Sequence, residues 1–140
     1  MQLNALVIDA NILISALLKD SFTRKILLGS RKPKLFAPEF IIEELSVYLP
    51  EFAKRLKVRE TELKISLEQL LIESKLRVVS RQVYSEFMEK SVAISTDAKD
   101  AQYFALAMKL VCPIWSQDLD FKSQSAIKIY STKELLEKFL

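Results

Sequence analysis

The stretch Leu3–Asn11, LNALVIDAN, decides the fold of this chain. Its apolar run as far as Ile8 is interrupted only by Asn4, which is typical of a β-strand buried on both faces. Asp9 ends the run, and apolar residues at helical spacing follow from Ile12 onward. The pattern predicts a buried strand that turns directly into a helix, with an acid at the turn.

Strand patterns and helix patterns alternate along the rest of the chain. Because parallel strands need crossover connections, this alternation indicates an α/β fold. We expect a three-layer α/β/α sandwich with a central parallel sheet of about five strands, in one domain over 1–140 with a helical arm at about 51–75. The expected strands are 3–8, 34–37, 76–79, 113–116 and 127–130, and the expected helices are 12–17, 21–28, 39–49, 51–74, 83–92, 98–110 and 132–139.

The composition excludes several classes of enzyme. The chain has no histidine, which removes the Ser-His-Asp hydrolases, and its single glycine, Gly29, removes the P-loop and the dinucleotide fingerprint. The single cysteine, Cys112, is expected to be a small buried hydrophobe rather than part of a disulfide or zinc site. The chain begins without a basic signal region, and no apolar run approaches the ~20 residues of a membrane span. We therefore expect a cytoplasmic protein that does not enter a membrane.

Four acids, Asp9, Glu44, Asp100 and Asp118, each interrupt or end an apolar run. Asp9 follows the first expected strand and Asp118 lies two residues beyond the fourth. Ligands of an open parallel sheet bind beyond the carboxyl ends of its strands, so these two acids converge if the strands are neighbours. Glu44 shares a helix face with apolar residues, whereas Glu43 faces outward. Asp100 extends the apolar stripe of its helix at the N-terminal end.

Each acid also has a purely structural explanation. Asp9 and Asp97 suit helix N-caps, and Glu44 suits a half-exposed helix position. Asp118 and Asp120 suit Asx turns in a loop. Taken together, however, several like charges brought close would destabilise the fold unless a cation lies between them. Ligands that are all oxygen favour Mg²⁺ or Mn²⁺ over zinc.

A hard divalent ion would give this chain a chemistry that does not need histidine. Such an ion activates water for attack on phosphorus and neutralises charge on the leaving oxygen, which allows phosphodiester hydrolysis. Asn11 and Ser116 would support the site by hydrogen bonding to a ligand carboxylate or to water on the metal. Asp97 would either support the site or join the ligands.

Basic residues gather in two stretches of the chain. The first contains Arg24, Lys25, Arg31 and Lys32, and the second lies within 54–59. A phosphate-binding surface and a solvated helix face both produce such stretches, so both interpretations stay open. We take the four residues of the first stretch as candidates for nucleic-acid binding.

Four short segments resemble the acidic motifs of the PIN-domain ribonucleases. Val7–Asn11, VIDAN, resembles the strand-one motif of that family, and Pro38–Leu45 resembles the second motif. Asp97–Ala101 resembles the third motif and Ile114–Phe121 the fourth. The resemblance spans nearly the whole chain, with the motifs in the order that the family has.

The resemblance implies a fold, a chemistry and partners. It implies a PIN-like domain that acts as a Mg²⁺- or Mn²⁺-dependent endoribonuclease on single-stranded RNA. It also implies a small toxin with a partner antitoxin, and a homodimer. The implied catalytic and metal-binding acids are Asp9, Glu44, Asp100 and Asp118, supported by Asn11 and Ser116.

The chain departs from the family at Gln117, where a glycine usually precedes the fourth acid. A larger side chain there is expected to restrict the loop that carries Asp118. Asp120 is therefore kept as an alternative or additional fourth ligand.

Two rival functions use the same residues differently. A phosphatase would use Asp9 as nucleophile, but such an enzyme needs a helper acid two residues later, where this chain has Asn11. A non-catalytic module would bind RNA or a protein on the same fold and use the acids only as an electrostatic patch. The second alternative stays open at the level of sequence.

Overall fold

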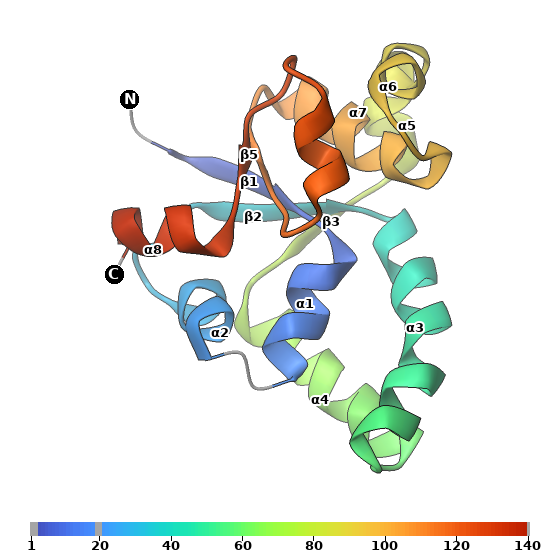
Figure 1. The fold of residues 1–140 in the computed structure, drawn as a ribbon, viewed down its shortest axis with the longest axis vertical. Coiled ribbons are helices and arrows are strands. Elements are labelled where there is room, and N and C mark those ends of the chain that lie inside the picture. Colours follow the sequence, from blue (N-terminus) through green and yellow to red (C-terminus); the bar gives the residue numbers. More distant parts are fainter. Residues whose placement is uncertain (1–2, 19–20, 140) are drawn as a thin grey trace.

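The computed structural model describes residues 3–18 and 21–139. A five-stranded sheet crosses the molecule with its strands in the order β3-β2-β1-β4-β5, and every neighbouring pair is parallel (Figure 1). The strands are β1 (Ala5–Ile8), β2 (Lys34–Pro38), β3 (Arg77–Val79), β4 (Ile114–Trp115) and β5 (Ile129–Tyr130). β1 is the central strand, with β2 and β4 as its neighbours.

Helices cover both faces of this sheet. In Figure 1, α5, α6 and α7 lie above the sheet, α1, α2, α3 and α4 lie below it, and α8 lies at the left, next to α2. The expected α/β/α sandwich with five parallel strands is therefore confirmed. The helices are α1 (Ala10–Leu17), α2 (Ser21–Leu28), α3 (Phe40–Leu56), α4 (Glu60–Glu73), α5 (Arg81–Tyr84), α6 (Met88–Ile94), α7 (Ala101–Leu110) and α8 (Thr132–Phe139).

The opening stretch forms the centre of the core. Leu6, Val7 and Ile8 of β1 have no exposed surface, and Trp115 of the neighbouring β4 is equally buried. Parallel strands covered on both faces require such continuous apolar runs. Within the described residues, no helix is both long and apolar enough to cross a membrane.

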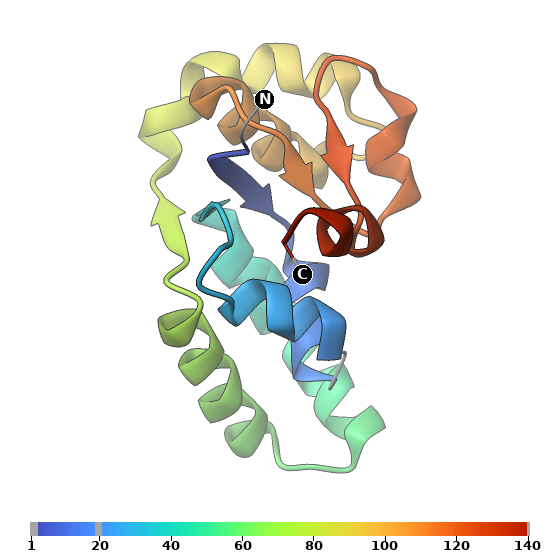
Figure 2. The same cartoon turned by 90° about the vertical axis from the view of Figure 1, so that its left-hand side faces the viewer.

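The helical arm differs from the expectation of one helix over 51–74. Pro50 lies inside α3, which continues to Leu56, and the chain reverses at Lys57 in a left-handed conformation before α4 begins. Leu45, Leu49 and Ala53 form one buried stripe along α3, so tertiary packing keeps the helix intact past the proline. Figure 2 shows α3 and α4 as an antiparallel pair.

The leucines on one side of α4 face the interior of the molecule rather than solvent. Leu63, Leu67 and Leu70 are buried, so this apolar side of the helix is covered by the protein itself.

Three shorter elements also differ from the expectations. The helix expected over 83–92 is divided into α5, a 3-10 turn η1 (Ser85–Phe87) and α6, and the helix expected from 98 begins with a 3-10 turn η2 (Ala98–Asp100). The 3-10 turn η3 (Leu119–Ser123) follows β4 and was not expected from the sequence pattern. The strands are shorter than predicted at most ends because pairing stops before the apolar runs do.

Candidate active site

The four predicted acids come from four separate segments and line one small pocket at the carboxyl edge of the sheet. Asp9 follows β1, and Asp118 follows β4, which is the parallel neighbour of β1. Glu44 comes from α3 and Asp100 from η2. The pocket has a volume of about 130 Å³. Its remaining lining residues are Ala10, Asn11, Tyr48, Lys99, Tyr103 and Phe121.

Asp9 is held rigidly at the base of this pocket. Its side chain is only 4% exposed, and its Oδ1 accepts a hydrogen bond from the backbone N–H of Ile12, at 3.2 Å, which caps α1. The hydroxyl of Ser116 donates to Oδ2 of Asp9. Burial raises the pKa of Asp9 to about 7, and the negative charges of Glu44 and Asp118 add to this increase. The charged form of Asp9 is therefore costly without a nearby cation.

Asp100 is in a similar electrostatic position. It is 8% exposed, and burial raises its pKa to about 7, with further contributions from the negative charges of Asp97, Asp118 and Glu44. Two carboxyl groups on the same pocket thus share an environment that disfavours their ionised forms. Such strongly perturbed acids in one cleft are a feature of functional sites.

Two tyrosines position Glu44. The hydroxyl of Tyr103 donates to Oε1 of Glu44, and the hydroxyl of Tyr48 donates to Oε2 at 3.4 Å. Burial, followed by the charge of Glu44, raises the pKa of Tyr103, so this hydroxyl stays protonated and continues to donate. The neighbouring Glu43 is exposed, as its helix position predicted.

Sequence reasoning missed this role of both tyrosines. A local signal exists for Tyr48, which lies four residues after Glu44 on the same helix face, but not for Tyr103, which is 59 positions away.

Ser116 connects the acids of the two neighbouring strands. Besides donating to Asp9, its Oγ accepts the backbone N–H of Asp118 at 3.0 Å. Oδ1 of Asp118 accepts the N–H of Asp120 at 2.9 Å, which is an Asx turn opening η3. Asp120 itself is exposed and does not line the pocket. The structure thus brings Asp118, and not Asp120, to the other acids.

Asp97 and Gln117 lie just outside the pocket. Oδ1 of Asp97 accepts the N–H of Lys99 at 3.1 Å, so this acid caps η2. Oε1 of Gln117 accepts the N–H of Thr132 at 2.8 Å, at the start of α8. The larger side chain in place of glycine is therefore tied to α8, while Asp118 still lines the pocket.

The acids surround the pocket without forming a closed coordination shell. Among residues 3–18 and 21–139, no three acidic side chains stand close enough together to hold a metal ion in their present rotamers. The donor set nevertheless fits a hard divalent ion, because every candidate ligand is a carboxylate and two of them are destabilised by burial.

The four basic candidates lie elsewhere. Arg31 and Lys32 belong to the loop before β2, at the amino edge of the sheet, and they line a shallow hollow together with Lys25. Nη1 of Arg24 donates to the backbone oxygen of Ala16 at 3.4 Å. None of these four lines the acidic pocket. Lys99 does line it, and it was not identified from the sequence.

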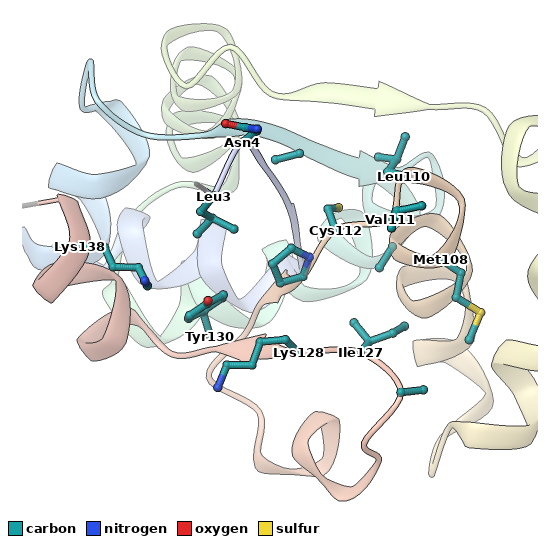
Figure 3. Close-up of a pocket in the computed structure, with 14 residues that line it drawn as sticks. Leu3, Asn4, Met108, Leu110, Val111, Cys112, Ile127, Lys128, Tyr130 and Lys138 are labelled. Atoms are coloured by element: carbon teal, nitrogen blue, oxygen red, sulfur yellow. The ribbon is translucent and has the colours of Figure 1, made fainter. Parts of the chain in front are cut away.

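A larger hollow of about 860 Å³ lies at the amino edge of the sheet (Figure 3), opposite the edge that carries the acids. It is lined mainly by apolar side chains such as Leu3, Ile127 and Cys112, with Lys128 and Lys138 on either side of Tyr130. Cys112 is a free, half-buried thiol whose pKa burial raises to about 11, in keeping with the expected apolar role. No acid of the described chain lines this hollow, so it is separate from the acidic pocket.

Solved structures share this fold at low sequence identity. PAE2754 from Pyrobaculum aerophilum matches with a TM-score of 0.72 and 18% identity, covering 98% of this chain and 89% of that protein. A toxin-antitoxin complex from Klebsiella pneumoniae matches with a TM-score of 0.63 and 17% identity, covering 91% and 97%. VapBC2 from Rickettsia felis, bound to a DNA fragment from its promoter, matches with a TM-score of 0.67 and 13% identity, covering 91% and 98%.

A comparison with curated proteins gave no match. The family model described as the PIN domain, in contrast, matches residues 7–139. That range includes all four acids of the pocket and every strand of the sheet except the first two residues of β1. The chain therefore belongs to the PIN-domain family, whose members are generally nucleases.

Proposed function

We propose that this protein is a metal-dependent endoribonuclease that hydrolyses phosphodiester bonds of single-stranded RNA. The observation that carries the proposal is the convergence of Asp9, Glu44, Asp100 and Asp118 on one pocket from four distant segments. Helix capping and Asx turns explain where Asp9 and Asp118 sit in their own segments. They do not explain why the carboxylates share a pocket that raises the pKa of two of them.

The proposed cofactor is Mg²⁺ or Mn²⁺, held by the same four acids. A bound divalent ion supplies water activation and charge neutralisation at the phosphate. Because no three of the acids in the described chain are yet within ligand distance of a common point, binding requires side-chain rotation into the pocket. The free-energy cost of such rotamer changes is small compared with the free energy gained when an ion neutralises the buried carboxylates.

The surrounding groups keep the proposed ligands in place. Ser116 fixes Asp9 and the backbone of Asp118, and Tyr103 with Tyr48 fixes Glu44. Asn11 lines the pocket, and Asp97 caps the turn before Asp100. Supporting contacts of this type hold ligands in productive geometry and are often needed for metal affinity.

We further propose that the protein is a cytoplasmic toxin-type nuclease that forms homodimers and is controlled by an antitoxin. Support comes from family membership and from the toxin-antitoxin complexes among the structural neighbours. Arg24, Lys25, Arg31 and Lys32 remain candidates for secondary contacts to RNA outside the pocket. Their distance from the acids in the fold makes them unsuited to hold the phosphate that is cut.

One observation favours a second candidate function, a non-catalytic RNA- or protein-binding module. The described acids are not positioned as a ready metal cluster. A module of this kind would use the pocket as a negatively charged patch and would not cleave RNA.

Cleavage of labelled single-stranded RNA with and without Mn²⁺ separates the two functions. We expect Mn²⁺-dependent cutting that Asp9→Asn and Asp100→Asn reduce by about 10²-fold or more. Glu44→Gln and Glu43→Gln form a matched pair, because the two residues are adjacent and only Glu44 lines the pocket. Glu44→Gln should lose activity and Glu43→Gln should keep it. Cutting that persists in EDTA would contradict the metal-dependent mechanism.

A further inference from the structure

The four acids give the pocket a negative charge, which disfavours binding of a negatively charged substrate. RNA is a polyanion, and a pocket of carboxylates repels it wherever no cation intervenes. Among the described residues that line this pocket, Lys99 is the one basic side chain. It lies in η2, directly before Asp100.

The local backbone holds Lys99 at the rim of the pocket. The N–H of Lys99 donates to Oδ1 of Asp97, and its Nζ lies 3.7 Å from Oδ2 of the same acid. Because the side chain of Lys99 is 53% exposed, its ammonium group is hydrated and carries the positive charge that a lysine has at neutral pH. Lys99 thus lines the same pocket as Tyr48, Glu44 and Asp100.

The contact between Lys99 and Asp97 is weak enough to be exchanged. The two side chains are 53% and 49% exposed, and the Nζ–Oδ2 distance is long for an ion pair. Exposed pairs of this type contribute little to stability, and solvent and salt screen them. A phosphate that enters the pocket can therefore replace Asp97 as the partner of Lys99 without a large cost to the fold.

We propose that Lys99 is a substrate-binding residue that contacts a backbone phosphate of RNA at the rim of the acidic pocket. This inference rests on the proposed function and specifies how the pocket accepts its substrate. Lys99 holds a phosphate next to the one that is cut, and the four acids remain free to bind the ion. The lysine contacts the sugar-phosphate backbone and not a base edge, so it contributes to affinity without sequence preference.

The test measures RNA affinity apart from catalysis. Binding of a fluorescein-labelled single-stranded RNA of mixed sequence is followed by anisotropy, with Ca²⁺ in place of Mn²⁺ and with KCl varied. Lys99→Met should weaken binding roughly tenfold, as expected for loss of one charged hydrogen bond. The slope of log K against log salt should fall by about 0.7, which is the contribution of one phosphate contact to a single strand.

Two control variants sharpen the result. Lys99→Arg keeps the charge and should keep most of the affinity and the salt slope. Lys109→Met removes a comparably exposed lysine of α7, which pairs with Glu86 and does not line the pocket, and should bind like the wild type. Lys99→Gln is the second charge-removing variant and should match Lys99→Met if the loss of charge is responsible.

Thermal stabilisation by Mn²⁺ provides an independent readout. We expect Lys99→Met to retain the stabilisation that the wild type shows. Unchanged RNA affinity and salt slope in Lys99→Met and Lys99→Gln would overturn the inference, as would loss of the Mn²⁺ effect, which would place Lys99 with the acids. If wild type binds RNA through Lys99 but never cleaves it, the proposed function fails and this inference stands. If wild type cleaves RNA and the Lys99 variants bind RNA as tightly as wild type, the proposed function stands and this inference fails.

Discussion

The two edges of the sheet differ in the electrostatic free energy of the side chains that line them. At the carboxyl edge, four acids share a pocket of about 130 Å³, and burial raises the pKa of two of them. At the amino edge, a hollow of about 860 Å³ is lined mainly by apolar side chains and by two lysines that remain in contact with solvent. The electrostatic cost of ionised carboxylates therefore arises at the smaller pocket and not at the larger hollow.

The pH dependence of stability should show the cost of the carboxyl edge most clearly. Burial raises the pKa of Asp9 from 3.8, the ordinary value of an aspartate, to about 7 in the folded protein. An acid whose pKa is raised on folding contributes its full stabilisation at pH values below its pKa in the unfolded chain. This contribution is lost as the pH rises through its pKa in the folded protein. In EDTA, the free energy of unfolding should therefore decrease by about 3 kcal/mol between pH 5 and pH 8.

Urea unfolding at several pH values in this window checks the prediction. Asp9→Asn should remove most of the decrease, and Asp100 should account for a further part because its pKa is raised in the same direction. Glu134, whose pKa is lowered to about 2 chiefly by its hydrogen bond with the backbone of Ser131, affects stability only at more acidic pH. If the free energy of unfolding of the wild type stays constant from pH 5 to pH 8, the predicted electrostatic difference between the two edges is contradicted.

Gln117 offers a smaller test at the carboxyl edge. Gln117→Ala removes the acceptor for the N–H of Thr132 and should cost about 1 kcal/mol, the usual value of a helix-capping contact. It should also lower RNA cleavage moderately, because the same loop carries Asp118. Chemical denaturation and initial rates measure the two effects. Gln69→Ala, on the exposed face of α4, should change neither.

Val111 offers a test at the amino edge that involves no charge. This residue ends α7 with a φ of 52°, a left-handed conformation that is strained for a β-branched side chain, and it is 90% exposed. Val111→Gly should stabilise the protein by about 1 kcal/mol. The same substitution at Val92, an exposed residue inside α6, should destabilise it by a similar amount. Thermal unfolding of both variants decides this, and a loss of stability in Val111→Gly would contradict the assigned strain.

The parts of the structure that followed from sequence are those that depend on periodicity and strand order. Apolar runs predicted the five strands, and helix spacing distinguished Glu44 from Glu43. Parallel topology then predicted that acids after β1 and β4 would meet. The N-cap at Asp9 and the Asx turn at Asp118 were also predicted, and in the structure both acids line the pocket as well.

The parts that did not follow depend on tertiary contacts or on irregular backbone. The sequence pattern predicted separate helices over 39–49 and 51–74, whereas α3 continues through Pro50 to Leu56 because its buried stripe keeps packing. Lys99 lies in a 3-10 turn, where helical periodicity does not indicate which side chain faces a pocket. The bond between Tyr103 and Glu44 joins residues 59 positions apart, which no local pattern reveals. The roles of the acids in binding metal remain predictions.

Thermal unfolding of wild type and Asp9→Asn during a titration with MnCl₂ tests the central claim most directly. A ligand that binds only the folded state at a hundredfold excess over its Kd stabilises the protein by about 2.7 kcal/mol. We predict that the Tm of the wild type rises with Mn²⁺ and that the Tm of Asp9→Asn does not. Equal shifts in both proteins, or no shift in the wild type, would contradict a metal site at the carboxyl edge.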